Sequence, residues 1–169
     1  MRIVVIDVET TGLSPLGGDR IVEIGAVKIE NGAVKQEFSS LVNPGIRMSI
    51  SAGKINGITD EMLEDAPDPE IVFSKFSRFV GNACIVAHNA SFDLSFIRAE
   101  MARLGFGFNP PHQCALRLSR RRFPELPNYR LITVARHVLG SLPENLHLHR
   151  ALDDARLVAQ MWLEMMKNE

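Results

Sequence analysis

The sequence predicts an α/β fold with a central mixed five-stranded sheet flanked by helices. Its length of 169 residues is typical of one domain with a real hydrophobic core. Five short apolar segments predict strands, and the longer segments that follow them have the apolar spacing of helices. Strands that come first and then alternate with helices are typical of an α/β domain. We therefore expect residues 1–169 to form a single domain.

Three strands are predicted near the start of the chain. Ile3–Val8 is almost continuously apolar, which is typical of a strand covered on both faces. Ile21–Ile29 and Val34–Val42 flank Asn31-Gly32, a strong signal for a hairpin turn. The next segment, Asn43–Gly57, contains a proline and several glycines, so we expect an ordered loop there.

Helices and short strands alternate in the rest of the chain. Asp68-Pro69-Glu70 predicts a helix start, with Asp68 as the capping residue and Pro69 at the first helical position. We expect that helix to end at Gly81-Asn82. The further predicted elements are a strand at Cys84–Ala87, a helix at Ala90–Leu104, a strand at His112–Ala115, and helices at Leu116–Arg122, Arg130–Leu139 and Ala151–Met166.

Composition excludes several classes of protein. Hydrophobic residues make up 46% and charged residues 23%, which is ordinary for a soluble globular chain. No apolar run approaches the length of about 20 residues that a membrane span needs. Cys84 and Cys114 match no zinc or redox spacing. A cytoplasmic enzyme that does not enter the membrane is therefore the default expectation.

Charge is unevenly distributed although the net charge is only −1. The segment 117–136 contains one acid, Glu125, and the arginines at positions 117, 120, 121, 122, 130 and 136. Such a basic strip could contact phosphates, or it could be a solvated helix face, and the sequence leaves both interpretations open.

Two acids interrupt the first strand. Asp7 and Glu9 are two positions apart, so their side chains point to the same face of the sheet. They stand at the carboxyl end of an apolar strand, where open α/β sheets usually place ligands. A bound cation would explain both acids together. These residues alone also allow an exposed strand end with a capping role.

Helical periodicity tests the acids farther along the chain. Asp93 lies on the apolar face of its helix, but Glu100 falls near the same face, so position does not single out Asp93. In the last helix Asp154 lies at the flank of the apolar stripe, whereas Asp153 points to solvent. We therefore expect Asp154 to reach a cleft beside the sheet.

A histidine precedes the last helix. His149 is expected in a loop or cap position beside Asp154, and a histidine near a metal site suits general-base catalysis because its ordinary pKa lies near neutrality. A loop histidine is also often merely solvated. His147, two residues away, is the nearest competitor for the catalytic role.

Together these segments resemble the DEDDh exonucleases, the family of the proofreading epsilon subunit of bacterial DNA polymerase III and of ribonuclease T. The three motifs read Val5-Ile-Asp7-Val-Glu9-Thr-Thr-Gly12-Leu13, then Val86-Ala-His-Asn89-Ala-Ser-Phe92-Asp93, and finally His149-Arg-Ala-Leu-Asp-Asp154. The third has the family spacing H-x-x-x-x-D. Three motifs in order, each on its predicted element, make the resemblance specific over nearly the whole chain.

The resemblance implies a ribonuclease H-like fold and hydrolysis of single-stranded ends from the 3′ terminus, with release of nucleoside monophosphates. It assigns two divalent cations, Mg²⁺ or Mn²⁺, to Asp7, Glu9, Asp93 and Asp154, and the role of general base to His149. Carboxylates suit these hard cations. Two cations can bind the attacking water and stabilise the departing 3′ oxygen.

The resemblance also implies substrate contacts. The residues after the first motif, Thr10, Thr11, Gly12 and Leu13, map onto the binding site of the terminal nucleotide. A wedge against the last bases would involve Leu13 and the segment around Asn56, which stands where many relatives have a histidine and lacks a stacking ring. Asn89 and Phe92 are expected wall residues, although Phe92 fits the core equally well.

Several functional alternatives stay open at this point. The expected partner is a single-stranded nucleic acid 3′ end, with DNA favoured over RNA, but the four acids recognise phosphate and do not separate the two. An RNA-trimming enzyme and a non-catalytic polymerase-binding module are the alternatives. The epsilon subunit continues into a tail that binds the polymerase, whereas this sequence ends at Glu169. Either a stand-alone exonuclease or an excised domain of a polymerase subunit fits.

Overall fold

The sheet of the computed structural model, which describes residues 2–143 and 147–167, has five strands in the order β3-β2-β1-β4-β5. The strands are β1 (Arg2–Thr10), β2 (Ile21–Glu30), β3 (Ala33–Leu41), β4 (Cys84–Ala87) and β5 (His112–Cys114). β1 pairs antiparallel with β2 and parallel with β4, so the sheet is mixed. The predicted fold class is confirmed, with strand ends shifted by one or two residues.

The turn between β2 and β3 forms where Asn-Gly predicted it. Asn31 and Gly32 have φ values of 52° and 74°, the left-handed conformations that a two-residue hairpin turn of this kind needs. Asparagine tolerates this region better than most residues, and glycine has no Cβ to clash.

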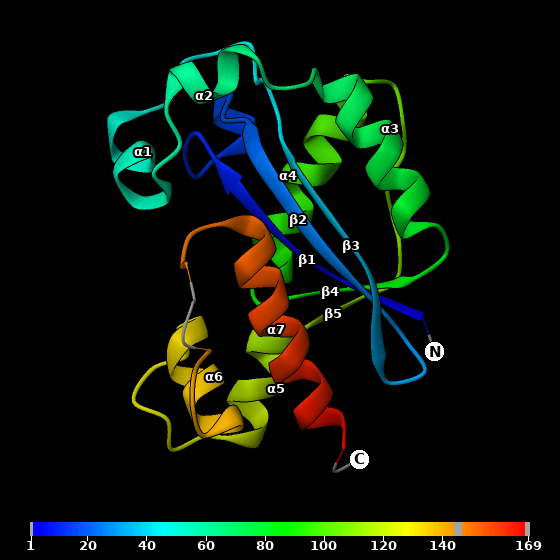
Figure 1. Ribbon diagram of the computed structural model, residues 1–169, viewed down its shortest axis with the longest axis vertical. Helices are drawn as coiled ribbons and strands as arrows, with labels where there is room; N and C mark the ends of the chain where they lie inside the picture. Colours follow the sequence, from blue (N-terminus) through cyan, green and yellow to red (C-terminus); the bar gives the residue numbers. More distant parts are fainter. Residues whose placement is uncertain (1, 144–146, 168–169) are drawn as a thin grey trace.

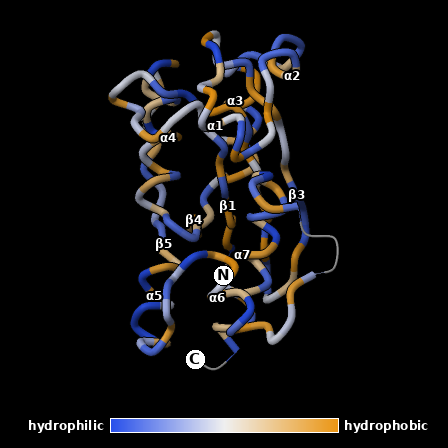
Figure 2. Tube along the Cα trace, turned by 90° about the vertical axis from the view of Figure 1, so that its left-hand side faces the viewer, coloured by the Kyte–Doolittle hydropathy of each residue, from blue (hydrophilic) through white to orange (hydrophobic). Residues whose placement is uncertain are grey.

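Helices cover both faces of the sheet (Figure 1). The long helices on one face are α3 (Pro69–Val80) and α4 (Ala90–Arg103), and those on the other are α5 (Ala115–Arg122), α6 (Leu131–Leu139) and α7 (Ala151–Met166). Even-numbered residues of β1, such as Val4 and Ile6, pack with α3 and α4, whereas Ile3 and Val5 pack with the other group. Figure 2 shows β1 as a hydrophobic strand inside the molecule. β1 is thus apolar on both faces, as predicted.

The expectation of a loop over Asn43–Gly57 is wrong, because that segment contains the helix α1 (Ile50–Asn56). A second short helix, α2 (Asp60–Glu64), follows it. Ser49 caps α1 by accepting a hydrogen bond from the amide of Ala52 at 3.2 Å, and Gly57 ends it in the left-handed conformation. Serine and glycine at these positions are helix boundary signals. Here the glycine is a helix end and not a loop residue.

The start of α3 corrects a second detail. Pro69 occupies the first turn as predicted, but the side chain of Asp68 forms no capping hydrogen bond. Its backbone carbonyl instead accepts from the amides of Ile71 and Val72. Pro69 has already removed one of the unpaired amides of the first turn, which reduces the need for a side-chain cap.

Two further expectations concern cysteines and membranes. Cys84 and Cys114 are both free thiols. In the described ranges 2–143 and 147–167, no helix is long and apolar enough to span a membrane.

Candidate active site

β1 places the first two acids on the face of the sheet that α7 covers. Asp7 and Glu9 are half-buried and continue the odd-numbered series of Ile3 and Val5, which packs with α7. In Figure 1, the carboxyl end of β1 lies below α2 and to the right of α1. The two carboxylates therefore share one face at the edge of the sheet where the sequence places a ligand.

α7 brings in a third carboxylate. Asp154 lies in the first turn and is only 7% exposed, whereas the side chain of the adjacent Asp153 is 24% exposed. Asp153 forms an ion pair with Arg156 at 2.9 Å, and its other oxygen lies 3.6 Å from the ring of His147. Of the two adjacent acids, Asp154 is thus the one directed toward the sheet.

α4 supplies the fourth carboxylate. Asp93 is 4% exposed and lies close enough to Asp7 to raise the pKa of that residue electrostatically. Glu100, which helical periodicity could not distinguish from Asp93, is also buried but is neutralised by two ion pairs. Its oxygens accept from Arg20 at 2.7 and 2.8 Å and from Arg103 at 3.2 Å. Asp93 has no such cation beside it among the described residues.

His149 stands next to this group. It has a φ of 62°, and its backbone amide donates to Asp154 Oδ2 at 3.1 Å. Ligand atoms of Glu9, His149 and Asp154 all lie within 4.8 Å of one another. A ring nitrogen of His149 thus lies beside the carboxylates of Glu9 and Asp154, while His147 lies beside Asp153. The structure therefore favours His149 over its competitor by position.

The electrostatics of the four carboxylates fit a cation site. Burial raises the pKa of Asp7 well above its usual value, and repulsion from Asp93, Asp154 and Glu9 raises it further. Burial, with smaller repulsive contributions, raises the pKa of Glu9 to about 7. Burial also raises the pKa of Asp93 to about 7, and it raises the pKa of Asp154 above its usual value. Asp154 Oδ1 is buried without a hydrogen-bond partner among the described residues. Bound divalent cations would relieve both the repulsion and the unpaired oxygen.

This arrangement predicts that metal-free stability falls as the pH rises. The folded pKa values of Glu9 and Asp93, about 7, exceed those of an unfolded chain. Protonation of these two carboxyl groups therefore stabilises the fold fully below about pH 4, and this stabilisation is lost as the pH rises through 7. We expect the Tm in EDTA to fall by about 5 °C or more between about pH 5 and pH 8. Millimolar Mg²⁺ should recover most of this loss at the higher pH and little at the lower pH.

The control is Asp93→Asn, which removes one titrating group at nearly constant volume. Its Tm in EDTA should fall less over the same pH range. An equal effect of Mg²⁺ at both pH values would contradict a cation site built from these carboxylates.

Sequence reasoning missed the pair that holds the start of α7. Glu23 on β2 lies opposite Glu9 in the strand register and is 3% exposed. It accepts from the Arg150 guanidinium at 2.7 and 3.2 Å and from the amide of Ala151 at 3.0 Å. A side chain at Gly25 would overlap the backbone of Ala151, so β2 and α7 are in direct backbone contact. The signal was present, because Glu23 interrupts an apolar strand just as Asp7 does.

The predicted nucleotide-binding segment divides into two parts. Thr10 and Thr11 are buried; their hydroxyls donate to the Gly12 carbonyl at 2.6 Å and to Asp19 at 3.2 Å, respectively. A side chain at Gly12 would overlap the Asp19 carboxylate. Leu13, in contrast, is 84% exposed. The threonines thus shape the loop, and Leu13 is the member that is free to touch a ligand.

The three remaining predicted substrate contacts, Asn56, Asn89 and Phe92, differ in burial and in their neighbours. Asn56 is 5% exposed; its side chain hydrogen-bonds to Glu9 and accepts from the amide of Ile58 at 3.0 Å. Its amide is therefore directed at a carboxylate of the site. Asn89 is exposed, and Phe92 is half-buried, with its ring 5.0 Å from that of Phe96.

Comparisons with known proteins identify the family. The family model described as exonuclease matches residues 4–162. The PolC-type DNA polymerase III of Caldanaerobacter subterraneus subsp. tengcongensis is 43% identical over 166 residues, which are 98% of this chain and 12% of that protein. The PolC-type enzyme of Bacillus subtilis is 38% identical over 168 residues, covering 98% of this chain and 11% of that protein. The chain thus spans about 12% of the length of such relatives.

Solved structures agree with this assignment. Exonuclease X in complex with 5′ overhanging duplex DNA superposes with a TM-score of 0.79 and 31% identity, covering 99% of this chain and 92% of that one. The nuclease domain of 3′hExo, described as a DEDDh family member, has a TM-score of 0.81 at 20% identity and covers 99% and 92%. At that identity it shows the fold alone. The chain therefore belongs to the exonuclease family, which confirms the resemblance to DEDDh exonucleases and the expectation of an enzyme.

Proposed function

We propose that this chain hydrolyses single-stranded DNA from the 3′ end and releases nucleoside 5′-monophosphates. The main support is that four carboxylates from three distant parts of the chain converge beside one histidine. Burial and mutual repulsion raise the pKa values of Asp7 and Glu9, so the group is costly to the fold without cations. Such strain at a cluster of titratable groups is typical of a functional site.

Asp7, Glu9, Asp93 and Asp154 would hold two divalent cations, Mg²⁺ or Mn²⁺, because these ions prefer oxygen ligands. When bound, the cations acidify the attacking water and stabilise charge on the phosphate and the departing 3′ oxygen. The carboxylates fix the positions of the ions, and Asn56 orients Glu9 through a hydrogen bond.

His149 would accept the proton of the attacking water. Its amide is tied to Asp154, and the next residue, Arg150, is tied to Glu23, so the backbone on both sides of the ring is held. Its side chain is exposed and close to Glu9 and Asp154, which leaves room for water beside the carboxylates. A base needs this combination of fixed position and access to solvent.

The terminal nucleotide would bind at the loop that follows β1. Gly12 lets the Asp19 carboxylate pack against the loop, and the exposed Leu13 offers an apolar surface to a base. Thr10 and Thr11 hold the shape of the loop through their hydroxyls. Asn89 and Phe92 would form part of the wall on the α4 side.

The relatives suggest the biological setting of this activity. The PolC-type proteins are named as DNA polymerases, and Exonuclease X was solved with DNA. We therefore propose DNA as the substrate and a proofreading or repair role beside a replicative polymerase, within the cytoplasm of a bacterium.

The choice between DNA and RNA is tested by comparing matched single-stranded oligonucleotides in Mg²⁺ and in Mn²⁺. We expect kcat/KM to be at least about tenfold higher for DNA, which corresponds to about 1.4 kcal/mol. A preference for RNA would instead indicate an RNA-trimming enzyme. Tight binding without cleavage of either would indicate a polymerase-binding or nucleic-acid-binding module.

A further inference from the structure

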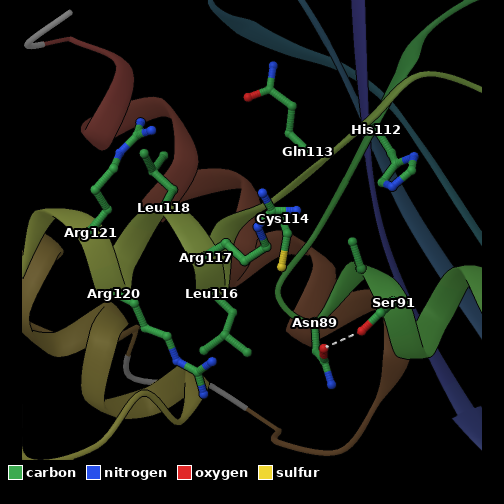
Figure 3. Close-up of a pocket in the computed structure, with 11 residues that line it drawn as sticks. Asn89, Ser91, His112, Gln113, Cys114, Leu116, Arg117, Leu118, Arg120 and Arg121 are labelled. Atoms are coloured by element: carbon green, nitrogen blue, oxygen red, sulfur yellow. Dashed lines mark hydrogen bonds between the residues drawn. The ribbon is translucent and has the colours of Figure 1, made fainter.

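A polar cavity of about 600 Å³ opens where β4 meets α4 and β5 meets α5. Its volume lies within the usual range of ligand cavities. Figure 3 shows Arg117 beside Cys114 at the centre of the view, with Arg121 above and Arg120 below. Asn89 and Ser91, at the start of α4, form the other wall and share a hydrogen bond of 3.1 Å.

The lining of this cavity is basic. Arg117, Arg120 and Arg121 are exposed, and no acid is among the residues that line it. Arg120 lies over the ring of Tyr129 at 5.6 Å. Within residues 2–143 and 147–167, neither Arg117 nor Arg121 forms an ion pair or a side-chain hydrogen bond. Two guanidinium groups without an anion are ready donors for phosphate.

The position of the cavity relative to the carboxylates follows from the strand register. β4 pairs in parallel with β1, and β5 with β4, so the ends of all three strands lie on one edge of the sheet. Val5 pairs with Val86, and Ala87 pairs with Cys114, so the start of α5 lies two strands away from β1 on this edge. The amide of Leu116 donates to the His88 carbonyl at 2.8 Å and fixes α5 beside this edge.

The Leu13 loop and α1 lie on the other side of Asp7, toward β2. A strand whose last nucleotide occupies the Leu13 side and whose scissile phosphate meets the carboxylates must continue in the opposite direction. That direction leads to the cavity. The sign of the side-chain charge also changes along this path, from four acids at the cleavage point to arginines beyond it. Arginines are expected where phosphates are bound but not hydrolysed.

We propose that this cavity binds backbone phosphates of the substrate strand on the 5′ side of the scissile bond, through Arg117 and Arg121. The proposal rests on the proposed function. It assigns a role to the basic strip that sequence reasoning left open between phosphate contact and solvated surface. Phosphate contacts of this kind contribute affinity without reading sequence.

The test is the double variant Arg117→Gln/Arg121→Gln, assayed in Mg²⁺ on single-stranded DNA of about twelve nucleotides and on a dinucleotide. We expect KM for the longer substrate to rise about tenfold, with kcat changed by less than about twofold, because uniform binding is lost. For the dinucleotide, which is too short to reach the cavity, the rise in KM should stay below about twofold. The slope of log KM against log salt should become shallower by about 1.4 for the longer substrate.

The control is Arg136→Gln, which removes a charge from the same basic strip outside the cavity and should change KM by less than about twofold. Equal effects of both variants would show a general basic field and overturn the proposal. So would an effect that appears only with duplex DNA, since the cavity would then hold the complementary strand. If the wild type cleaves the longer DNA and the double variant has the same KM, the cavity proposal fails alone. If the wild type cleaves neither length, the proposed function fails and this proposal with it.

Discussion

Asp7→Asn is expected to lower kcat/KM on single-stranded DNA by at least about a thousandfold, or about 4 kcal/mol of transition-state stabilisation. Burial raises the pKa of Asp7, and repulsion from Asp93, Asp154 and Glu9 raises it further, so its charge is felt together with those of all three other acids. The amide keeps the shape of the side chain but loses the negative charge that a cation needs. The measurement is steady-state cleavage over a range of Mg²⁺ concentrations.

The fold should tolerate this change. Removing one of four mutually repelling carboxylates should leave the Tm in EDTA at about pH 8 unchanged or higher, although Asp7 is half-buried. Asp153→Asn is the matched control, because Asp153 lies beside the site but forms an ion pair with Arg156, and it should retain activity within about twofold. An Asp7→Asn protein that still cleaves DNA at a tenth of the wild-type rate would contradict the metal-binding role.

His149→Asn is expected to lower kcat by about a hundredfold or more with a small change in KM, since a positioned general base contributes about 10² to 10⁴ in rate. Asparagine is the appropriate replacement because His149 has a left-handed backbone, which asparagine also tolerates. The backbone hydrogen bond to Asp154 can therefore persist, and the loss can be attributed to the ring. Single-turnover cleavage of a labelled oligonucleotide measures it directly.

His147→Asn removes the competing ring, which is 78% exposed and lies 3.6 Å from Asp153. Its activity should stay within about twofold of the wild type. If His147→Asn instead had the large effect and His149→Asn the small one, the assignment of the base would be reversed.

Regular spacing explains why much of this site was predictable from sequence. Asp7 and Glu9 share a face because strands alternate with a period of two, and Asp154 is favoured over Asp153 because helices turn by about 100° per residue. These rules depend only on local geometry. The same applies to the hairpin at Asn31-Gly32, where two left-handed conformations demand residues that tolerate them.

Contacts between distant segments were not predictable in this way. Glu100 and Asp93 share a helix face, and only the packing of Arg20 against α4 shows that Glu100 is a neutralised structural acid. Asn56 was placed near the last bases by resemblance alone, and its hydrogen bond to Glu9 depends on the packing of α1, which sequence spacing does not reveal. Glu23 could have been suspected as an acid in an apolar strand, yet its partner Arg150 lies far away in sequence. Partner choice over such separations is set by tertiary packing.

The direct backbone contact between β2 and the start of α7 must form before the candidate site is complete. Asp7 and Glu9 leave the ribosome well before His149 and Asp154, which stand far later in the sequence. Until α7 docks against Gly25, a growing chain holds only part of the acidic cluster and no histidine beside it. Because His149 and Asp154 reach the site only through the start of α7, any displacement of its first turn from Gly25 would separate them from Asp7 and Glu9.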